Sequence, residues 1–347
     1  MTELPTSRAE TDPERDRKAE HIHLALEGRM QMEHRYFDQL VFEHSALPEI
    51  DLAEVDLSTE FVGKPLAGPL LVSCMTGGTE QAELINRNLA AGAERAGVAV
   101  GVGSQRKAIE DPRTGGTFQV RDVAPNVPLL GNLGAVQLNY GYGIDECRAA
   151  VAMIDADALV LHLNPLQEAL QPEGDGDFSG LLPRIAEIVR ELEVPVIVKE
   201  IGMGLSGAVG RRLADVGVQI LDTAGTGGTS WARIEAQRAD DLEIGELFSD
   251  WGIPTPESIR QLREIPGITV IGSGGVRNGI DAARAVALGA DLVGLAYPFL
   301  AAAMTSADAV TERIERTLRE LRISMFCVGA RTLGELRSRR LIDRTQS

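Results

Sequence analysis

The stretch TVIGSGGVRNGIDAARAVALGADLVGLAYP, residues 269–298, contains a strand, a glycine-rich turn, a helix and a second strand in direct succession. Its first apolar run, at 269–275, passes into the glycine-rich text GSGGVRNG at 272–279. The pattern GIDAARAVALGA that follows is typical of a helix, and a second apolar run begins at residue 292. A strand, a helix and a strand in this order predict two parallel strands joined by a right-handed crossover.

The same alternation recurs throughout residues 69–298. Six further apolar runs lie at 69–75, 98–103, 128–134, 158–164, 195–201 and 219–225. Helical patterns such as those at 82–97 and 181–193 separate them, and the connection 104–127 is the least helical. Eight units favour an α/β fold closed as a (β/α)8 TIM barrel over an open doubly wound sheet.

This reading divides the chain into four parts. We expect a disordered tail over residues 1–12 and an N-terminal helical extension over 13–68 that contributes to the substrate site. The barrel is expected over 69–335, followed by a C-terminal tail over 336–347.

Composition excludes several classes of protein. The chain of 347 residues is 44% hydrophobic but only 4% aromatic, so its core must consist mainly of aliphatic side chains. A formal net charge of -17 would repel nucleic acid and anionic membranes. The three cysteines, Cys74, Cys147 and Cys327, lack paired spacing, and the N-terminal region has no apolar signal segment, so a cytoplasmic protein is expected.

Polar residues follow the predicted strands at one end only, which in a barrel is the end that carries the active site. The segment HLNPLQE, residues 162–168, is the densest of these endings. His162 and Asn164 should share one face of an extended chain, and Pro165 should force the chain out of the strand, leaving Gln167 and Glu168 in a loop. A strand end with ordinary surface polar groups would explain any one of these residues, but four within seven positions favour a site.

Two other strand endings suggest an anionic ligand. The glycines at 272–279 would allow backbone amides to approach a phosphate near a helix N-terminus, although a tight turn alone would also require glycine. Lys199, after the apolar residues 196–198, should face a negative charge on a ligand unless Glu200 pairs with it. Trp231 is either a lid aromatic or a packing residue. The basic segment at 15–26 would form a diphosphate clamp if it folded over the barrel mouth.

The residues of these motifs resemble those of type 2 isopentenyl diphosphate isomerases, the flavin-dependent form. The likeness runs from about Arg17 to Glu335, and the matching motifs are RKAEHI, LPEIDLAEVDLSTEFVGKPL, MTGG, GSQRKA, GNLGA, LHLNPLQE, KEIGMG, DTAGTGGTSWARIE and SGGVRNGIDAARAVALGAD.

The resemblance implies a barrel enzyme of isoprenoid biosynthesis that interconverts isopentenyl diphosphate and dimethylallyl diphosphate. It implies FMN, active in its reduced form, with Mg²⁺, and NAD(P)H as a reductant that is not consumed stoichiometrically. It also implies a homo-oligomer, a tetramer or octamer, with no nucleic-acid or membrane partner. The reduced flavin would exchange protons with the alkene, since ordinary side chains are poorly suited to protonate it.

Site residues carry over position by position. The implied FMN contacts are Met75, Thr76, Gly77, Ser104, Asn132, Lys199, Thr229, Gly274, Gly275, Arg277, Ala296 and Tyr297. The implied substrate contacts are Arg17, Lys18, His21, Ser104, Gln105, Arg106, Asn164 and Gln167. Glu168 would bind Mg²⁺, and the catalytic set would be Gln167, His162 and Lys199.

One rival on the same barrel is an FMN-dependent oxidoreductase of 2-hydroxy acids. Such an enzyme needs a histidine base and arginines at a strand end to hold a carboxylate. The ending of the sixth run, DTAGTGGTSW at 222–231, contains neither residue type. A second alternative is a non-catalytic flavin or phosphate sensor. In such a protein the segment HLNPLQE and the pair Arg17 and Lys18 would have no function.

Overall fold

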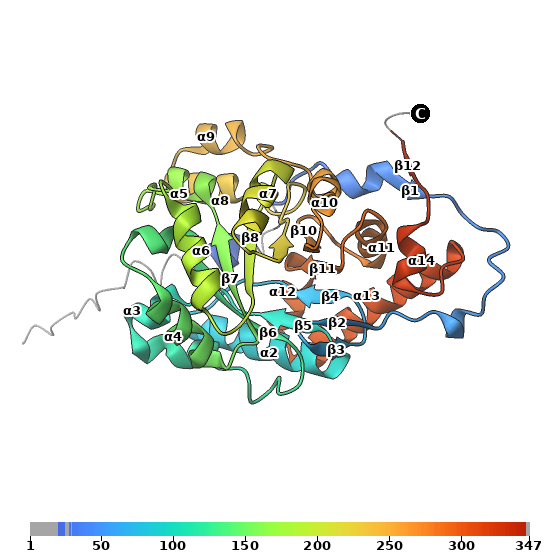
Figure 1. The fold of residues 1–347 in the computed structure, drawn as a ribbon, viewed down its shortest axis with the longest axis horizontal. Coiled ribbons are helices and arrows are strands. Elements are labelled where there is room, and N and C mark those ends of the chain that lie inside the picture. Colours follow the sequence, from blue (N-terminus) through green and yellow to red (C-terminus); the bar gives the residue numbers. More distant parts are fainter. Residues whose placement is uncertain (1–19, 25–27, 29, 345–347) are drawn as a thin grey trace, which may run out of the picture.

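The computed structural model describes residues 20–24, 28 and 30–344. Eight parallel strands form a closed barrel at its centre, in the order β10-β11-β4-β5-β6-β7-β8-β9 (Figure 1). These strands are β4 (Leu70–Val72), β5 (Ala99–Gly101), β6 (Leu129–Gly134), β7 (Ala158–Leu163), β8 (Val196–Glu200), β9 (Ile220–Asp222), β10 (Thr269–Ser273) and β11 (Leu292–Leu295). Each strand lies within one of the eight predicted apolar runs, so the predicted barrel is confirmed.

The barrel interior is filled by aliphatic side chains, one or two from each strand, among them Leu71, Leu130, Ile197 and Ile271. Because side chains alternate along a strand, the other face of each strand packs against the surrounding helices. Phe61 and Leu66 join the interior cluster from a hairpin of β2 (Thr59–Phe61) and β3 (Lys64–Leu66), which directly precedes β4 and covers the amino end of the barrel.

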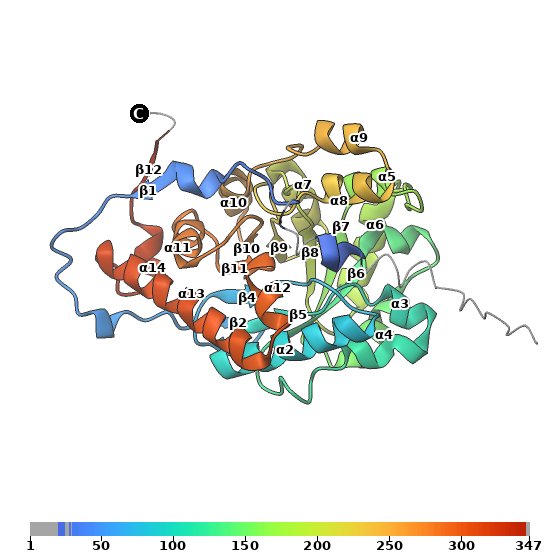
Figure 2. The same ribbon diagram turned by 180° about the vertical axis from the view of Figure 1, so that it is seen from behind.

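Helices surround the strands on the outside (Figures 1 and 2). They include α2 (Glu80–Ala96), α4 (Ile144–Ile154), α6 (Leu181–Glu191), α7 (Gly207–Asp215), α10 (Thr255–Arg263), α11 (Gly279–Ala287) and α13 (Ala307–Cys327). The helical patterns predicted at 82–97, 181–193 and 279–290 correspond to α2, α6 and α11. Between β5 and β6 lie only the short α3 (Arg106–Glu110) and the 3-10 helix η3 (Pro112–Phe118), as the weak helical pattern there predicts.

Shorter helices follow several of the barrel strands, and one comes after α13. These are η4 (Ala135–Asn139), α5 (Pro165–Leu170), α8 (Trp231–Arg238), α9 (Leu242–Leu247), α12 (Tyr297–Ala303) and α14 (Leu333–Arg337). In the part of the chain that the structure describes, no helix has both the length and the apolar character to cross a bilayer.

The predicted N-terminal helical extension is described from residue 20 onward, with gaps at 25–27 and 29. Its described part has helical residues 20–24, the 3-10 helices η1 (Tyr36–Gln39) and η2 (Leu52–Glu54), and strand β1 (Leu40–Phe42). Strand β1 pairs antiparallel with β12 (Leu341–Asp343), which the sequence patterns did not predict. Residues 30–32 instead bond to the loop at the barrel mouth, where the Met32 amide donates to the Gly228 carbonyl at 2.8 Å. The extension therefore reaches the carboxyl ends of the strands.

Candidate functional site

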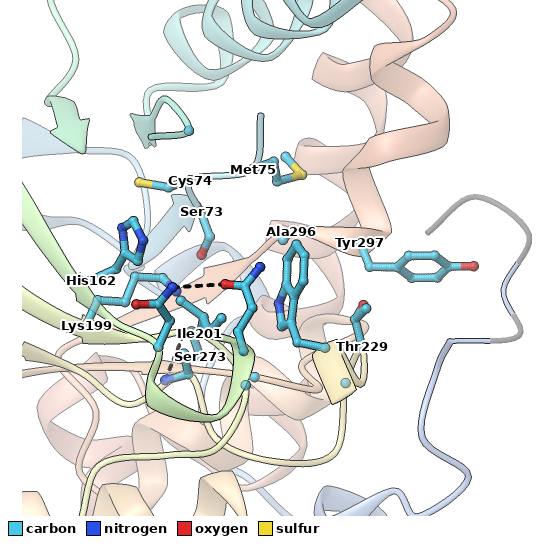
Figure 3. A pocket seen from close by; sticks show the side chains of 18 of the residues that line it. Ser73, Cys74, Met75, His162, Lys199, Ile201, Thr229, Ser273, Ala296 and Tyr297 are labelled. Atoms are coloured by element: carbon cyan, nitrogen blue, oxygen red, sulfur yellow. Dashed lines mark hydrogen bonds between the residues drawn. The ribbon is translucent and has the colours of Figure 1, made fainter. Parts of the chain in front are cut away.

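A cavity of about 310 Å³ opens at the carboxyl ends of the barrel strands and is bordered by the N-terminal extension. Figure 3 shows Cys74, His162 and Lys199 on one side of it and Thr229, Ala296 and Tyr297 on the other. The predicted site residues that line it are His21, Met75, Thr76, Gly77, Ser104, Arg106, Asn132, His162, Asn164, Gln167, Glu168, Lys199, Thr229, Gly274, Gly275, Arg277, Ala296 and Tyr297. Two further predicted residues, Arg17 and Lys18, lie outside the described residues.

Gln105 is not brought to the cavity. Its side chain is fully buried, its Oε1 accepts the Asn132 amide at 2.9 Å, and its Nε2 donates to the Ala150 carbonyl at 2.8 Å. Gln105 directly precedes α3, and its neighbours Ser104 and Arg106 both line the cavity, whereas its own side chain points away from it toward α4. Gln105 therefore supports the end of β6 from behind.

The predicted pairing of His162 and Asn164 on one face holds, since both line the cavity. Gln167 and Glu168, however, lie in the first turns of α5 and not in a loop. Pro165 ends the strand as predicted, but its fixed φ also suits the first position of a helix, so α5 begins there directly.

His162 lies at the end of β7 with its Nδ1 2.8 Å from Asn132 Oδ1, so this nitrogen carries the proton. Burial, with the charge of Lys199, lowers the pKa of His162 to about 3, against a hydrogen bond to the Leu133 backbone that raises it. The ring is therefore neutral at physiological pH and carries no charge toward a diphosphate.

Lys199 is the buried cation of the cavity floor. The strand register places it between His162 on β7 and Asp222 on β9. Its Nζ donates to the backbone carbonyl of Glu200 at 2.5 Å, whereas a pairing with the Glu200 carboxylate was the expected alternative. That carboxylate instead accepts the amides of residues 201–203 at 2.5 to 2.7 Å and so fixes the loop after β8.

Asp222 is a buried acid that the sequence reasoning missed. Its carboxylate accepts the Ser273 hydroxyl and the Ala224 amide, and burial raises its pKa while the charge of Lys199 lowers it. Its position at the end of a predicted strand, within residues 219–225, could have marked Asp222 as a candidate site residue. Its neighbour on β8, Lys199, is known only once the strand register is known.

The glycine-rich loop after β10 fits a phosphate group. Gly274 and Gly275 have φ values of +102° and +69°, which side chains rarely adopt. The Thr255 hydroxyl donates to the Gly274 carbonyl at 2.7 Å, and Arg277 donates to the carbonyls of Gly275 and Gly227 at 2.9 and 2.8 Å. With these carbonyls bonded to protein donors, the loop brings the Arg277 side chain and glycine backbone to the cavity, which suits an anionic phosphate.

A polar network links α5 to α8. Asn164 Nδ2 donates to Glu168 Oε1 at 2.6 Å and to Gln167 Oε1 at 3.1 Å, while Gln167 Nε2 donates to Glu235 Oε1 at 2.7 Å. The other end of the Asn164 amide, Oδ1, is buried and has no hydrogen-bond partner. It therefore lies close to the Glu168 carboxylate that Nδ2 of the same amide contacts. One carboxylate with a neighbouring free amide oxygen fits Mg²⁺, which takes few protein oxygens and completes its shell with water and phosphate.

Glu235, on α8, is the second acid that the sequence reasoning missed. It is completely buried, and His21 Nε2 lies 3.2 Å from its Oε1. Burial raises its pKa, but His21, Gln167 and Arg238 together lower it to about 2, so it is ionised. Trp231 lines the cavity and meets His21 edge to face at 5.2 Å between ring centroids, a packing contact, and its lid role stays a prediction.

Comparisons with known proteins fit this geometry. The family model of FMN-dependent dehydrogenases matches residues 177–343. Isopentenyl-diphosphate delta-isomerases are similar over almost the whole chain: that of Nostoc sp. is 47% identical and covers 99% of each chain, and that of Synechococcus sp. is 52% identical and covers 92% of this chain and 94% of its own. That of Rickettsia bellii is 47% identical over 94% of this chain and 96% of its own.

Solved structures share the fold at much lower identity. A mandelate oxidase with a monooxide FMN adduct has a TM-score of 0.64 at 18% identity and covers 93% of this chain and 92% of its own. A lactate oxidase of Pediococcus acidilactici has a TM-score of 0.61 at 18% identity, with 88% and 84% covered. These likenesses establish the (β/α)8 barrel and nothing about the reaction.

Proposed function

The chain belongs to the isopentenyl-diphosphate delta-isomerase family, and on that premise we propose that it interconverts isopentenyl diphosphate and dimethylallyl diphosphate in isoprenoid biosynthesis. The observation that carries the proposal is the joint presence, in one cavity, of a phosphate-type glycine loop and the network of Asn164, Gln167 and Glu168. The first suits a flavin phosphate, and the second suits a metal-bound diphosphate.

FMN is the cofactor that fits the glycine loop and the family model. Gly274, Gly275 and Arg277 would hold its phosphate. Its ring would lie among the remaining predicted contacts, which are Met75, Thr76, Gly77, Ser104, Asn132, Lys199, Thr229, Ala296 and Tyr297. When bound and reduced, FMN supplies proton donor and acceptor nitrogens that act on an alkene without net redox change.

Lys199 acts on the charge of the bound cofactor. With FMN bound, the buried ammonium of Lys199 would stabilise negative charge on the reduced ring more strongly than an ammonium in water would. Neutral His162 beside it adds no competing charge. The pair would thus present one positive charge, that of Lys199, to the bound cofactor.

The α5 network acts on the diphosphate. Glu168, with Asn164 Oδ1, would hold Mg²⁺, and Arg106 would contribute a guanidinium. Arg106 lines the cavity and is held at 2.9 Å by Asp175, whose amide in turn donates to Glu168 at 2.7 Å. Arg17 and Lys18 are proposed to complete the binding of the diphosphate, with Ser104 and His21 beside them.

Gln167 is proposed to orient the transferred proton. An amide has no useful pKa, so it cannot be the primary base, but its two ends are fixed in this site. Asn164 donates to its oxygen, and Glu235 accepts from its nitrogen. A side chain fixed at both ends can hold the reacting alkene or a water in one orientation.

The remaining features of the proposal rest on the family likeness and on charge. We propose NAD(P)H as the physiological reductant, a homo-oligomer (tetramer or octamer), and a cytoplasmic location. The net charge of -17 supports the absence of a nucleic-acid or membrane partner. His21, Ile22 and Gln31 line the cavity, which supports the proposal that the extension over 13–68 forms part of the substrate site.

The decisive experiment is turnover by the purified, FMN-loaded protein. We expect conversion of isopentenyl diphosphate only after FMN reduction, with far less than one equivalent of NAD(P)H consumed per product, and inhibition by EDTA that Mg²⁺ reverses. Oxidation of a 2-hydroxy acid with stoichiometric use of O2 would support the oxidoreductase alternative instead. Full isomerase activity of protein without FMN would contradict the proposal.

A further inference from the structure

Arg238, the last residue of α8, contacts three glutamates that come from three parts of the chain. It donates to Glu235 on the same helix at 2.6 Å, to Glu173 after α5 at 2.8 Å, and to Glu20 in the N-terminal extension at 3.3 Å. Its side chain is only 11% exposed. Among the described residues that line the cavity, Arg238 does not occur.

We infer that Arg238 is a positioning residue that assembles the substrate half of the site by joining the N-terminal extension to the segment after α5. The inference rests on the proposed function for the identity of the substrate. A guanidinium suits this task because its planar fork donates in several directions at once and stays charged at any physiological pH.

Each of the joined parts carries residues of the cavity. Residues 20–24 bring His21 and Ile22 to its wall. The segment after α5 carries Gln171, which donates to Glu168, and Asp175, which bonds to both Glu168 and Arg106. Loosening either part therefore moves groups proposed to bind Mg²⁺ and diphosphate.

The contact with Glu235 connects Arg238 to the centre of the network. Glu235 is completely buried and holds both Gln167 and His21, so it needs a compensating positive charge. Arg238 supplies that charge from the side remote from the cavity. The phosphate loop at Gly274 and Gly275 makes none of these contacts with Arg238, so the FMN half should not depend on it.

Apolar packing also attaches the extension to α8 and is independent of Arg238. Leu24 and Met30 form a small buried cluster with Ile234, with Trp231 packed against it. Arg238 is thus expected to set the position and order of residues 20–24, while the apolar cluster keeps them near the barrel.

The test compares Arg238→Met with Arg233→Met in the FMN-loaded full chain. Arg233 lies on the same helix and pairs with Glu246, whose side chain is 67% exposed, at 2.9 Å, so it is a matched control. We expect Arg238→Met to raise KM for isopentenyl diphosphate about tenfold, equivalent to about 1.4 kcal/mol, with a smaller change in kcat. The Kd of FMN and both parameters of Arg233→Met should stay at wild-type values.

Arg238→Lys tests whether the planar guanidinium, and not only its positive charge, is required. One ammonium on a flexible stem cannot hold three carboxylates in the same geometry, so KM should remain well above the wild-type value. An unchanged KM in Arg238→Met, or a loss of FMN affinity as large as the loss of substrate affinity, would overturn the inference.

Amide hydrogen exchange without substrate separates this inference from the proposed function. Arg238→Met should accelerate exchange in residues 20–24 and 171–175, whether or not the protein isomerises the substrate. If Arg238→Met does not fold, Glu20→Gln should accelerate exchange only in the first segment and Glu173→Gln only in the second. Exchange at wild-type rates in all folded variants would overturn the inference, whereas changed exchange with no isomerase activity would overturn only the proposed function.

Discussion

At the scale of single residues, the floor of the cavity depends on one buried charge. Lys199 lies between a histidine that burial keeps neutral and a buried aspartate, and its ammonium bonds to a backbone carbonyl. Such a group is costly to bury and is kept where it acts on a ligand.

Lys199→Met should lower the midpoint potential of bound FMN. The loss of a charge-assisted contact to the reduced ring, worth roughly 1.5–3 kcal/mol, corresponds to roughly 30–60 mV for a two-electron couple. Spectroelectrochemical titration measures the shift. Lys64→Met is the control, because Lys64 pairs with Asp157 at 2.7 Å away from the cavity and should leave the potential unchanged. Equal potentials in both variants would exclude the proposed role of Lys199.

Gln167→Asn should reduce kcat about 100-fold with reduced FMN, the lower range for loss of a group that positions a proton. The shorter side chain cannot reach Asn164 and Glu235 together. Single-turnover rates under anaerobic conditions measure the effect. Gln81→Asn, on the exposed face of α2, is the control. Unchanged turnover in Gln167→Asn would remove this residue from the mechanism.

The one site residue that the sequence misplaced, Gln105, and the two that it missed, Asp222 and Glu235, share one physical cause. Gln105 sits between two cavity residues, and only the direction of its side chain shows that it is buried behind β6. Asp222 and Glu235 are single acids whose role depends on partners far along the chain. Motifs such as HLNPLQE are local and could be predicted, whereas contacts between distant segments could not.

At the scale of elements, the barrel strands were predictable because each one is a short, continuous apolar run covered on both faces. The extension was not, because β1 and β12 are each three residues long and half-buried. The barrel strands β4, β5 and β9 are equally short, but each lies within one of the eight longer apolar runs, whereas β1 and β12 do not. Their pairing is decided by tertiary contacts.

The loop after β10 allows an element-scale test. Gly275→Ala should abolish FMN binding, since a Cβ there would lie 2.5 Å from the Gly227 carbonyl oxygen and the backbone has a φ of +69°. Gly267→Ala has a similar φ of +76° but open space around the Cβ, so it should cost only about 1 kcal/mol of stability and retain FMN. Flavin fluorescence titration measures both. Normal FMN affinity in Gly275→Ala would contradict a phosphate role for this loop.

At the scale of the whole molecule, the two groups with strongly lowered pKa values predict acid sensitivity. The folded protein keeps His162 neutral down to a pKa of about 3, whereas the unfolded chain protonates it below 6.5, so stability falls as the pH drops through this window. Glu235, with a pKa of about 2 in place of 4.5, adds a loss of stability below pH 4.5.

Urea unfolding at fixed FMN loading should therefore show a loss of about 2 kcal/mol between pH 6.5 and pH 5. His162→Gln should flatten this part of the profile, because glutamine does not titrate. The steeper loss below pH 4.5 should persist in that variant. A wild-type profile that is flat from pH 6.5 to pH 5 would show that His162 is protonated in the folded protein.

The pairing of β1 with β12 has a consequence for biosynthesis. Residues 40–42 emerge from the ribosome long before residues 341–343, yet each strand bonds to the other. The N-terminal extension, which carries His21 and Gln31 to the barrel mouth, thus gains this pairing only after residues 341–343 have been translated. The last barrel strand, β11, is translated before β12, so the barrel can close before the entrance built by the extension is complete.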